Sequence, residues 1–135
     1  MSEALRWAPA LVWMVLIFVA SSLSSEALES SGAAKASRSA PVVANQVTVH
    51  LIEFGVLAAL LYRALSFQGG VFVRWVIVVV ATTAYGASDE FHQSFVPGRY
   101  SSWLDIAFDA VGATLGSSVA LAWIWLGLRV RPSTQ

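Results

Sequence analysis

The chain has 135 residues, of which 57% are hydrophobic and 12% charged, and its formal net charge is zero. A mean hydropathy of +0.69 indicates a membrane protein. The balanced charge gives no sign of a nucleic-acid partner. The absence of cysteine excludes disulfides, thiolate metal ligands and cysteine nucleophiles. Because each spanning helix takes about 20 apolar residues, the length predicts one domain, residues 1–135, with four spans.

The first predicted span covers about residues 7–23 and follows Arg6. Its basic start, apolar middle and Ala20-Ser21-Ser22 end also suit a cleaved secretory signal peptide. The length of the apolar run favours a helix that is retained. Residues 24–46, which are rich in serine and alanine, are predicted to form a loop on the outer side of the membrane.

Three further spans are predicted at about residues 47–65, 71–94 and 103–126. Gln68-Gly69-Gly70 predicts a tight turn, since glycine tolerates positive φ. The β-branched stretch Val73 to Thr83 would indicate a strand in water. In lipid, only helices and closed barrels satisfy the backbone, and four such apolar segments cannot close a barrel. The predicted fold is therefore all-α, a polytopic four-helix transmembrane bundle.

The basic residues predict which side of the membrane each end faces. With four spans, five of them share one side and three share the other. The first set is Arg6, Arg63, Arg74, Arg129 and Arg131, and the second is Lys35, Arg38 and Arg99. This excess predicts that both termini are cytoplasmic.

Acidic residues gather at one depth of the predicted bundle. An ionisable side chain in the middle of a membrane costs roughly 2.5–3.5 kcal/mol on insertion scales, so such a cluster is a functional hypothesis by default. With a helix rise of about 1.5 Å per residue, five of the eight acidic residues fall in the outer half of the bilayer. They are Glu53, Asp89, Glu90, Asp105 and Asp109.

Helical spacing brings these groups onto shared faces. His50 and Glu53 are separated by one turn, and Tyr85, Asp89 and His92 form one stripe on the third span. On the fourth span, Asp105 and Asp109 continue into Gly112-x-x-x-Gly116. Such paired glycines let a neighbouring backbone approach closely. We therefore expect the carboxylates to point into the bundle, around a cavity that opens to the outer face.

Charge balance sharpens this expectation. Five carboxylates against Arg99 leave about four uncompensated negative charges if the histidines are neutral, which a low-dielectric site cannot hold. Protonated carboxyl groups, protonated His50 and His92, a bound cation or a cationic ligand would each neutralise them. Simpler roles stay open: helix capping with Ser102 for Asp105, solvation at the interface for Glu90, packing for His50, and surface anchoring for Arg99.

The segment from Asp89 to Arg99, followed by Ser102, Asp105, Asp109, Gly112 and Gly116, resembles the signature of the VanZ-like membrane protein family. His50-x-x-Glu53-Phe54 and the serines that end the first span resemble that family as well. In the family the position of Asp109 is often Asn, so a carboxylate need not be essential there. The resemblance implies a multi-pass protein of the inner (plasma) membrane, at the cell-envelope face. The namesake is associated with low-level resistance to teicoplanin, a glycopeptide with a fatty-acyl tail.

The first functional hypothesis is a site that binds or processes a lipid-linked or amphiphilic cell-envelope molecule, with the lipid bilayer and that ligand as the only implied partners. Its ligand-binding candidates are His50, Glu90, Gln93, Arg99, Asp105 and Asp109.

The second hypothesis is a metal-dependent or acid/base hydrolase or transferase acting on a lipid or lipid phosphate. Its catalytic candidates are Glu53, Asp89 and His92. A divalent metal would draw its ligands from His50, Glu53, Asp89, His92 and Asp109. The third hypothesis is a proton- or cation-coupled carrier, which the lack of an inverted repeat disfavours. The sequence leaves the ligand and the oligomeric state open.

Overall fold

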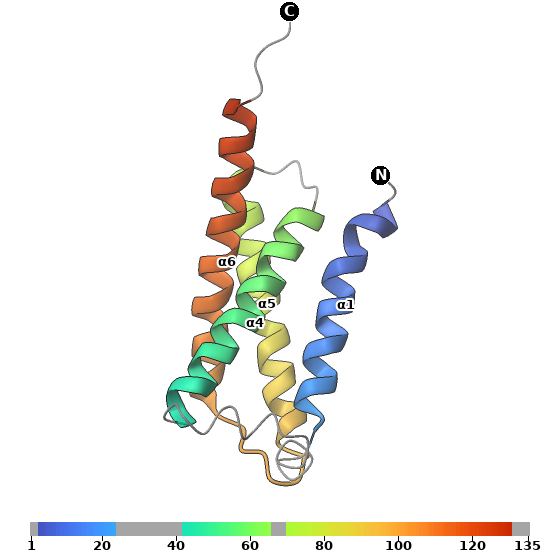
Figure 1. Ribbon diagram of the computed structural model, residues 1–135, viewed down its shortest axis with the longest axis vertical. Coiled ribbons are helices and arrows are strands. Elements are labelled where there is room, and N and C mark those ends of the chain that lie inside the picture. Colours follow the sequence, from blue (N-terminus) through green and yellow to red (C-terminus); the bar gives the residue numbers. More distant parts are fainter. Residues whose placement is uncertain (1–2, 24–41, 66–69, 131–135) are drawn as a thin grey trace, which may run out of the picture.

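A computed structural model describes residues 3–23, 42–65 and 70–130 and contains four helices within them (Figure 1). They are α1 (Glu3–Ser21), α4 (Val42–Ala64), α5 (Val71–Gln93) and α6 (Trp103–Val130). Successive helices run in opposite directions, so α1 begins and α6 ends at the same end of the bundle (Figure 1). All four are long and apolar enough to cross a membrane. The predicted all-α class is confirmed.

Three of the described helices extend at one end beyond the apolar runs that predicted them, whereas α5 matches its predicted span to within one residue. The first begins at Glu3, the second at Val42, and the last continues to Val130. Hydropathy marks where apolar residues start, whereas a helix continues for as long as its backbone bonds can form. Residues 42–46 of the predicted outer loop thus belong to α4, while residues 24–41 and 66–69 lie outside the described part of the chain.

The closest packing joins α4 to α6 and depends on glycine. A Cβ atom on Gly112 would lie 2.7 Å from the carbonyl oxygen of Leu51, and one on Gly116 would overlap the carbonyl oxygen of Gly55. The two backbones therefore touch, as the Gly112-x-x-x-Gly116 spacing predicted. This contact sets the N-terminal half of α4 beside the N-terminal half of α6.

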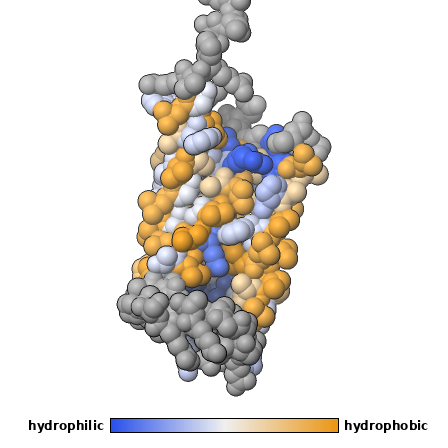
Figure 2. All heavy atoms as spheres, in the orientation of Figure 1, coloured by the Kyte–Doolittle hydropathy of each residue, from blue (hydrophilic) through white to orange (hydrophobic). Residues whose placement is uncertain are grey.

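The other helices complete the bundle around this pair. The α5 helix packs mainly on α6, and α1 packs mainly on α4. Apolar clusters fill the middle of the bundle, one around Tyr62 and Val78 and another around Ile17 and Phe54. Most of the surface in Figure 2 is hydrophobic, and the most hydrophilic residues on this face lie at two levels along the bundle.

We call the end where α1 begins and α4 ends the basic end. There Arg6 Nη2 donates to the carbonyl oxygen of Ala64 at 3.0 Å. Arg74 donates to the carbonyl of Tyr62, and its guanidinium lies 4.2 Å from the centre of the Tyr62 ring. Two arginines from different helices thus satisfy the carbonyls that the last turn of α4 leaves unpaired.

Candidate functional site

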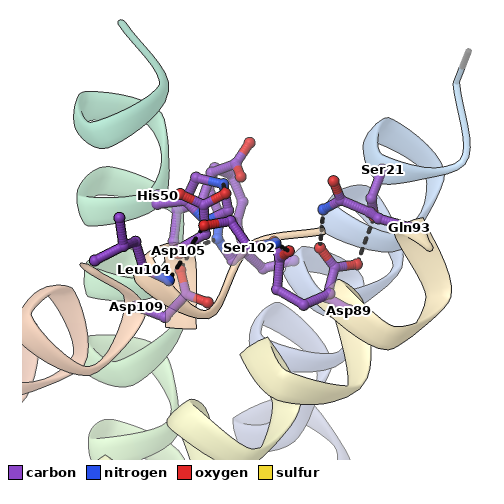
Figure 3. A network of polar contacts seen from close by, with 11 residues as sticks. Ser21, His50, Asp89, Gln93, Ser102, Leu104, Asp105 and Asp109 are labelled. Atoms are coloured by element: carbon purple, nitrogen blue, oxygen red, sulfur yellow. Dashed lines mark hydrogen bonds and ion pairs between the residues drawn. The ribbon is translucent and has the colours of Figure 1, made fainter. Parts of the chain in front are cut away.

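The opposite end, where α1 and α5 end and α4 and α6 begin, is here called the polar end. Its side chains form two groups, which Figure 3 shows on either side of Ser102. The first group joins α1 to α5. Asp89 is only 5% exposed. Its Oδ1 accepts from the Ser21 hydroxyl at 2.5 Å and its Oδ2 from Gln93 Nε2 at 2.8 Å. Both carboxylate oxygens are therefore satisfied.

The same group continues along the last turn of α1. His92 Nε2 lies 3.0 Å from the Ser22 hydroxyl, and its ring packs against Phe18 with centroids 4.5 Å apart. Arg99 Nη2 donates to the carbonyl oxygen of Ala20 at 3.2 Å. One turn deeper, the Tyr85 hydroxyl donates to the carbonyl of Met14 at 2.7 Å. Each of the three residues in the predicted stripe, Tyr85, Asp89 and His92, thus contacts α1 or the serine that follows it.

The second group joins α4 to α6. His50 Nδ1 lies 2.8 Å from Asp109 Oδ1, and His50 Nε2 lies 3.9 Å from Asp105 Oδ2. Asp109 is fully buried, with its carboxylate against Gly86 of α5, where a Cβ atom would overlap it. Asp109 Oδ2 has no hydrogen-bond partner among the described residues.

Glu90 connects this group to the start of α6. Its Oε2 accepts from the backbone N–H of Ser102 at 2.7 Å, which is the bond that Asp105 would accept in a capping box. Ser102 is the N-cap, because its hydroxyl accepts from the N–H of Leu104 at 3.2 Å. Glu90 therefore accepts the capping bond that the sequence suggested for Asp105. The Asp105 carboxylate instead lies toward His50.

Glu53 lies between the two groups and is half-buried. It is near enough to His50, Asp89 and Asp109 to interact electrostatically with each of them. Its backbone carbonyl accepts from Trp13 Nε1 at 2.9 Å, which is a further contact with α1. Glu53 thus lies within electrostatic reach of both groups.

The structure therefore divides the residues that the sequence placed at one site. His50, Asp105 and Asp109 lie together with Glu90, whereas Asp89, His92, Gln93 and Arg99 lie along α1. Of the five predicted metal ligands, Asp89 and His92 contact serines of α1. In the described part of the chain, the side chains whose ligand atoms converge for a metal are His50, Glu90 and Asp105.

Sequence reasoning assigned no site role to the first helix, which contributes Trp13, Ser21 and Ser22. Two adjacent hydroxyls at the end of an apolar span were the available signal, since hydroxyls in lipid seek partners on neighbouring helices. Ser102 was weighed only as a cap.

A model of the VanZ/LLP1 family matches residues 6–126 of the chain, which include α4, α5 and most of α1 and α6. The chain belongs to the VanZ/LLP1 family. No curated protein and no solved structure matches it. Family membership together with the four apolar helices makes this VanZ/LLP1 protein a multi-pass membrane protein.

Proposed function

We propose that this VanZ/LLP1 protein binds or processes a lipid-linked or amphiphilic cell-envelope molecule at its polar end. The observation that carries the proposal is the position of buried charged groups beside exposed aromatic side chains. Phe91, Phe95 and Trp103 are all exposed at this end. Tryptophan and tyrosine are enriched where hydrocarbon meets headgroups, so Trp103 and the exposed Tyr100 support a headgroup depth for the charged groups.

An amphiphile matches this arrangement better than a water-soluble molecule does. Its polar head would reach the groups between the helix ends, and its acyl or prenyl chain would lie along the apolar flanks of the bundle. Phe91 and Phe95 form an edge-to-face pair with centroids 5.1 Å apart. This pair offers an exposed apolar surface at the same end of α5 as Asp89 and Glu90.

The unpaired atoms at this end indicate what the head would carry. Arg99 Nε is buried and has no hydrogen-bond partner among the described residues, so a phosphate could be bound there. The surrounding carboxylates favour donors, such as amines or hydroxyls, on the rest of the head. A lipid phosphate bearing sugars or amines has both features. An acylated glycopeptide such as teicoplanin supplies the donors and offers a carboxylate in place of the phosphate.

The binding test uses the protein in nanodiscs, with undecaprenyl phosphate and teicoplanin as separate probes. We expect saturable binding of at least one probe, with a loss of about tenfold or more in Arg99→Ala if the pair is desolvated. Inorganic phosphate and teicoplanin stripped of its acyl chain serve as tail-free controls and should bind far more weakly. Binding that Arg99→Ala leaves unchanged, or no saturable binding of either probe, would refute the proposal.

We further propose that the polar end faces outward, on the outer side of the inner membrane. Arg6, Arg63 and Arg74 lie at the basic end and Arg99 at the polar end, which supports this orientation by the positive-inside rule. Because the chain has no cysteine, Ser101→Cys and Ala4→Cys are clean single-site reporters. An impermeant maleimide added to intact cells should label the first and spare the second. The reverse pattern would place the polar end inside.

A further inference from the structure

We infer that His50, Glu90 and Asp105 form a binding site for a divalent transition-metal ion, with Asp109 as the carboxylate that orients the histidine. The inference is independent of the proposed function, because it concerns a metal ion alone and does not involve Arg99. It changes the ligand set that the sequence indicated. Glu90 and Asp105 enter the set, and Asp109 supports the histidine in place of binding the metal. Three predicted ligands leave the set, namely Glu53, Asp89 and His92.

The three side chains come from α4, α5 and α6, and one ligand atom of each lies within 4.8 Å of the other two. Zinc ligands at about 2.0–2.1 Å from the metal in a tetrahedral site lie roughly 3.3 Å from one another. The observed group is therefore slightly wider than a closed site. A bound ion would have to draw the carboxylate oxygens of Glu90 and Asp105 closer to His50.

The histidine already has the orientation that a metal ligand needs. With Nδ1 at 2.8 Å from Asp109 Oδ1, the neutral ring donates its Nδ1–H to that carboxylate and keeps a lone pair on Nε2. Nε2 faces Asp105, but 3.9 Å is too long for a hydrogen bond between them. A carboxylate behind a histidine whose other nitrogen is open is the usual second shell of a metal-bound imidazole.

Glu90 supplies an independent indication of a ligand. Its side chain is 2% exposed, and the backbone N–H of Ser102 occupies Oε2. Its Oε1 is also buried and has no hydrogen-bond partner among the described residues. A buried carboxylate oxygen without a donor is uncommon and calls for an unplaced water or ion. Here that oxygen belongs to the residue that converges with His50 and Asp105.

Charge also favours a cation at this position. Glu90, Asp105 and Asp109 place three carboxyl groups around one imidazole, and a divalent ion would offset two of their negative charges. One imidazole and two carboxylates suit Zn²⁺, Mn²⁺ or Fe²⁺. Three protein ligands leave a coordination position open to water or a bound molecule, as in catalytic rather than structural zinc sites.

The metal-binding test uses the full-length protein in detergent, stripped with a chelator and titrated with Zn²⁺ and, separately, Mn²⁺. We expect one equivalent of at least one of these ions to bind. Glu90→Gln and Asp105→Asn should each lower its affinity by about tenfold or more, and Asp109→Asn by about 10–100-fold as a loss of second-shell support. Asp89→Asn, an amide change in the neighbouring group, is the matched control and should bind as the parent does.

A second measurement covers variants that fail to fold. Co²⁺ added to the parent protein should give visible d–d absorption that one equivalent of Zn²⁺ displaces, and Zn²⁺ should raise the Tm of the parent. Neither ion bound at one equivalent, or binding that Glu90→Gln and Asp105→Asn both leave unchanged, would overturn the inference. Binding lost only in Asp89→Asn would move the site to the group on α1.

Discussion

Two carboxylates at the same end of this bundle are buried to a similar extent but satisfied differently. Asp89, on α5, has a donor on each oxygen, from Ser21 and Gln93. Glu90, the next residue, has one donor from Ser102, and its other oxygen has no hydrogen-bond partner in the part of the chain that the structure describes. Adjacent positions on a helix point in directions about 100° apart, so Asp89 meets α1 while Glu90 meets α6.

This difference distinguishes a structural contact between helices from a binding site. A buried charged hydrogen bond with both partners present holds two helices together, and removing one partner leaves the other unpaired. A buried carboxylate oxygen that lacks a donor contributes no hydrogen bond of its own and is available to a ligand. Substitutions in the α1 group should therefore cost stability, and those in the α4–α6 group should cost binding.

The largest expected effect comes from a substitution that destabilises the whole bundle, and with it both groups of polar side chains. In Gly116→Val, the new side chain would collide with the backbone carbonyl of Gly55, which cannot move aside as a side chain can. We expect a loss of about 3 kcal/mol or more in the free energy of unfolding, at the upper end for overpacking. Gly127→Val, where nothing lies within 4 Å of the new Cβ, is the control. The free energy of unfolding is measured by denaturation in detergent. Equal values for the two variants would contradict the backbone contact between α4 and α6.

The next effect is confined to the α1 group. Asp89→Ala leaves the Ser21 hydroxyl and the Gln93 amide without their acceptor, and hydrogen bonds to a charged group contribute about 1.5–3 kcal/mol each. A loss of about 2–4 kcal/mol is expected, measured as a lower denaturation midpoint. Ser88→Ala is the control, because that exposed hydroxyl bonds only to its own helix at Tyr85. Equal stability of the two variants would mean that Asp89 does not fasten α1.

A smaller effect is expected when the α4–α6 group is disturbed from α5. In Gly86→Ala the methyl would occupy the space of the Asp109 carboxylate, so Asp109 must turn away from His50. Overpacking of this kind costs about 1–3 kcal/mol, and Zn²⁺ affinity should fall because His50 loses its orientation. Gly127→Ala is again the control. Full Zn²⁺ affinity in Gly86→Ala would separate Asp109 from the metal site.

The smallest effect gives the sharpest comparison between the adjacent carboxylates. Glu90→Gln keeps an acceptor for Ser102 and removes a charge that forms no ion pair with a lysine or arginine of the described residues. In chelator-treated protein its stability should change by less than about 1 kcal/mol. Asp89→Asn keeps one acceptor oxygen and places its NH₂ donor against the other donor, Ser21 or Gln93, which should cost about 1–3 kcal/mol. Thermal melts of the two variants measure this difference in stability. A larger loss in Glu90→Gln than in Asp89→Asn would make Glu90 the structural carboxylate and Asp89 the candidate ligand.

Much of this architecture could be predicted from the sequence, because lipid leaves few choices. Val73 to Thr83 must be helical where no water can bond the backbone, and the spacing of Gly112 and Gly116 anticipated a close backbone approach. The depth shared by His50, Asp105 and Asp109 followed from helix rise alone.

The division of the site could not be predicted in this way. Periodicity shows which residues share a face of one helix, as with Asp89 and His92, but not which neighbouring helix that face meets. That depends on how four helices pack around one another, and here α1 takes the face. The bond from Ser102 to Glu90, where the sequence suggested Asp105, could not be predicted for the same reason. It joins two helices that only tertiary packing brings together.

The polar contacts along α1 also fix its height relative to the other helices. Arg6 bonds near one end of α1, Trp13 near its middle and Ser21 at the other end, to Ala64, Glu53 and Asp89 respectively. A piston movement by even one residue, about 1.5 Å, would strain all three bonds together. In a thicker or thinner bilayer, α1 therefore cannot adjust its depth alone, and the whole bundle would have to tilt or the lipid to deform around it.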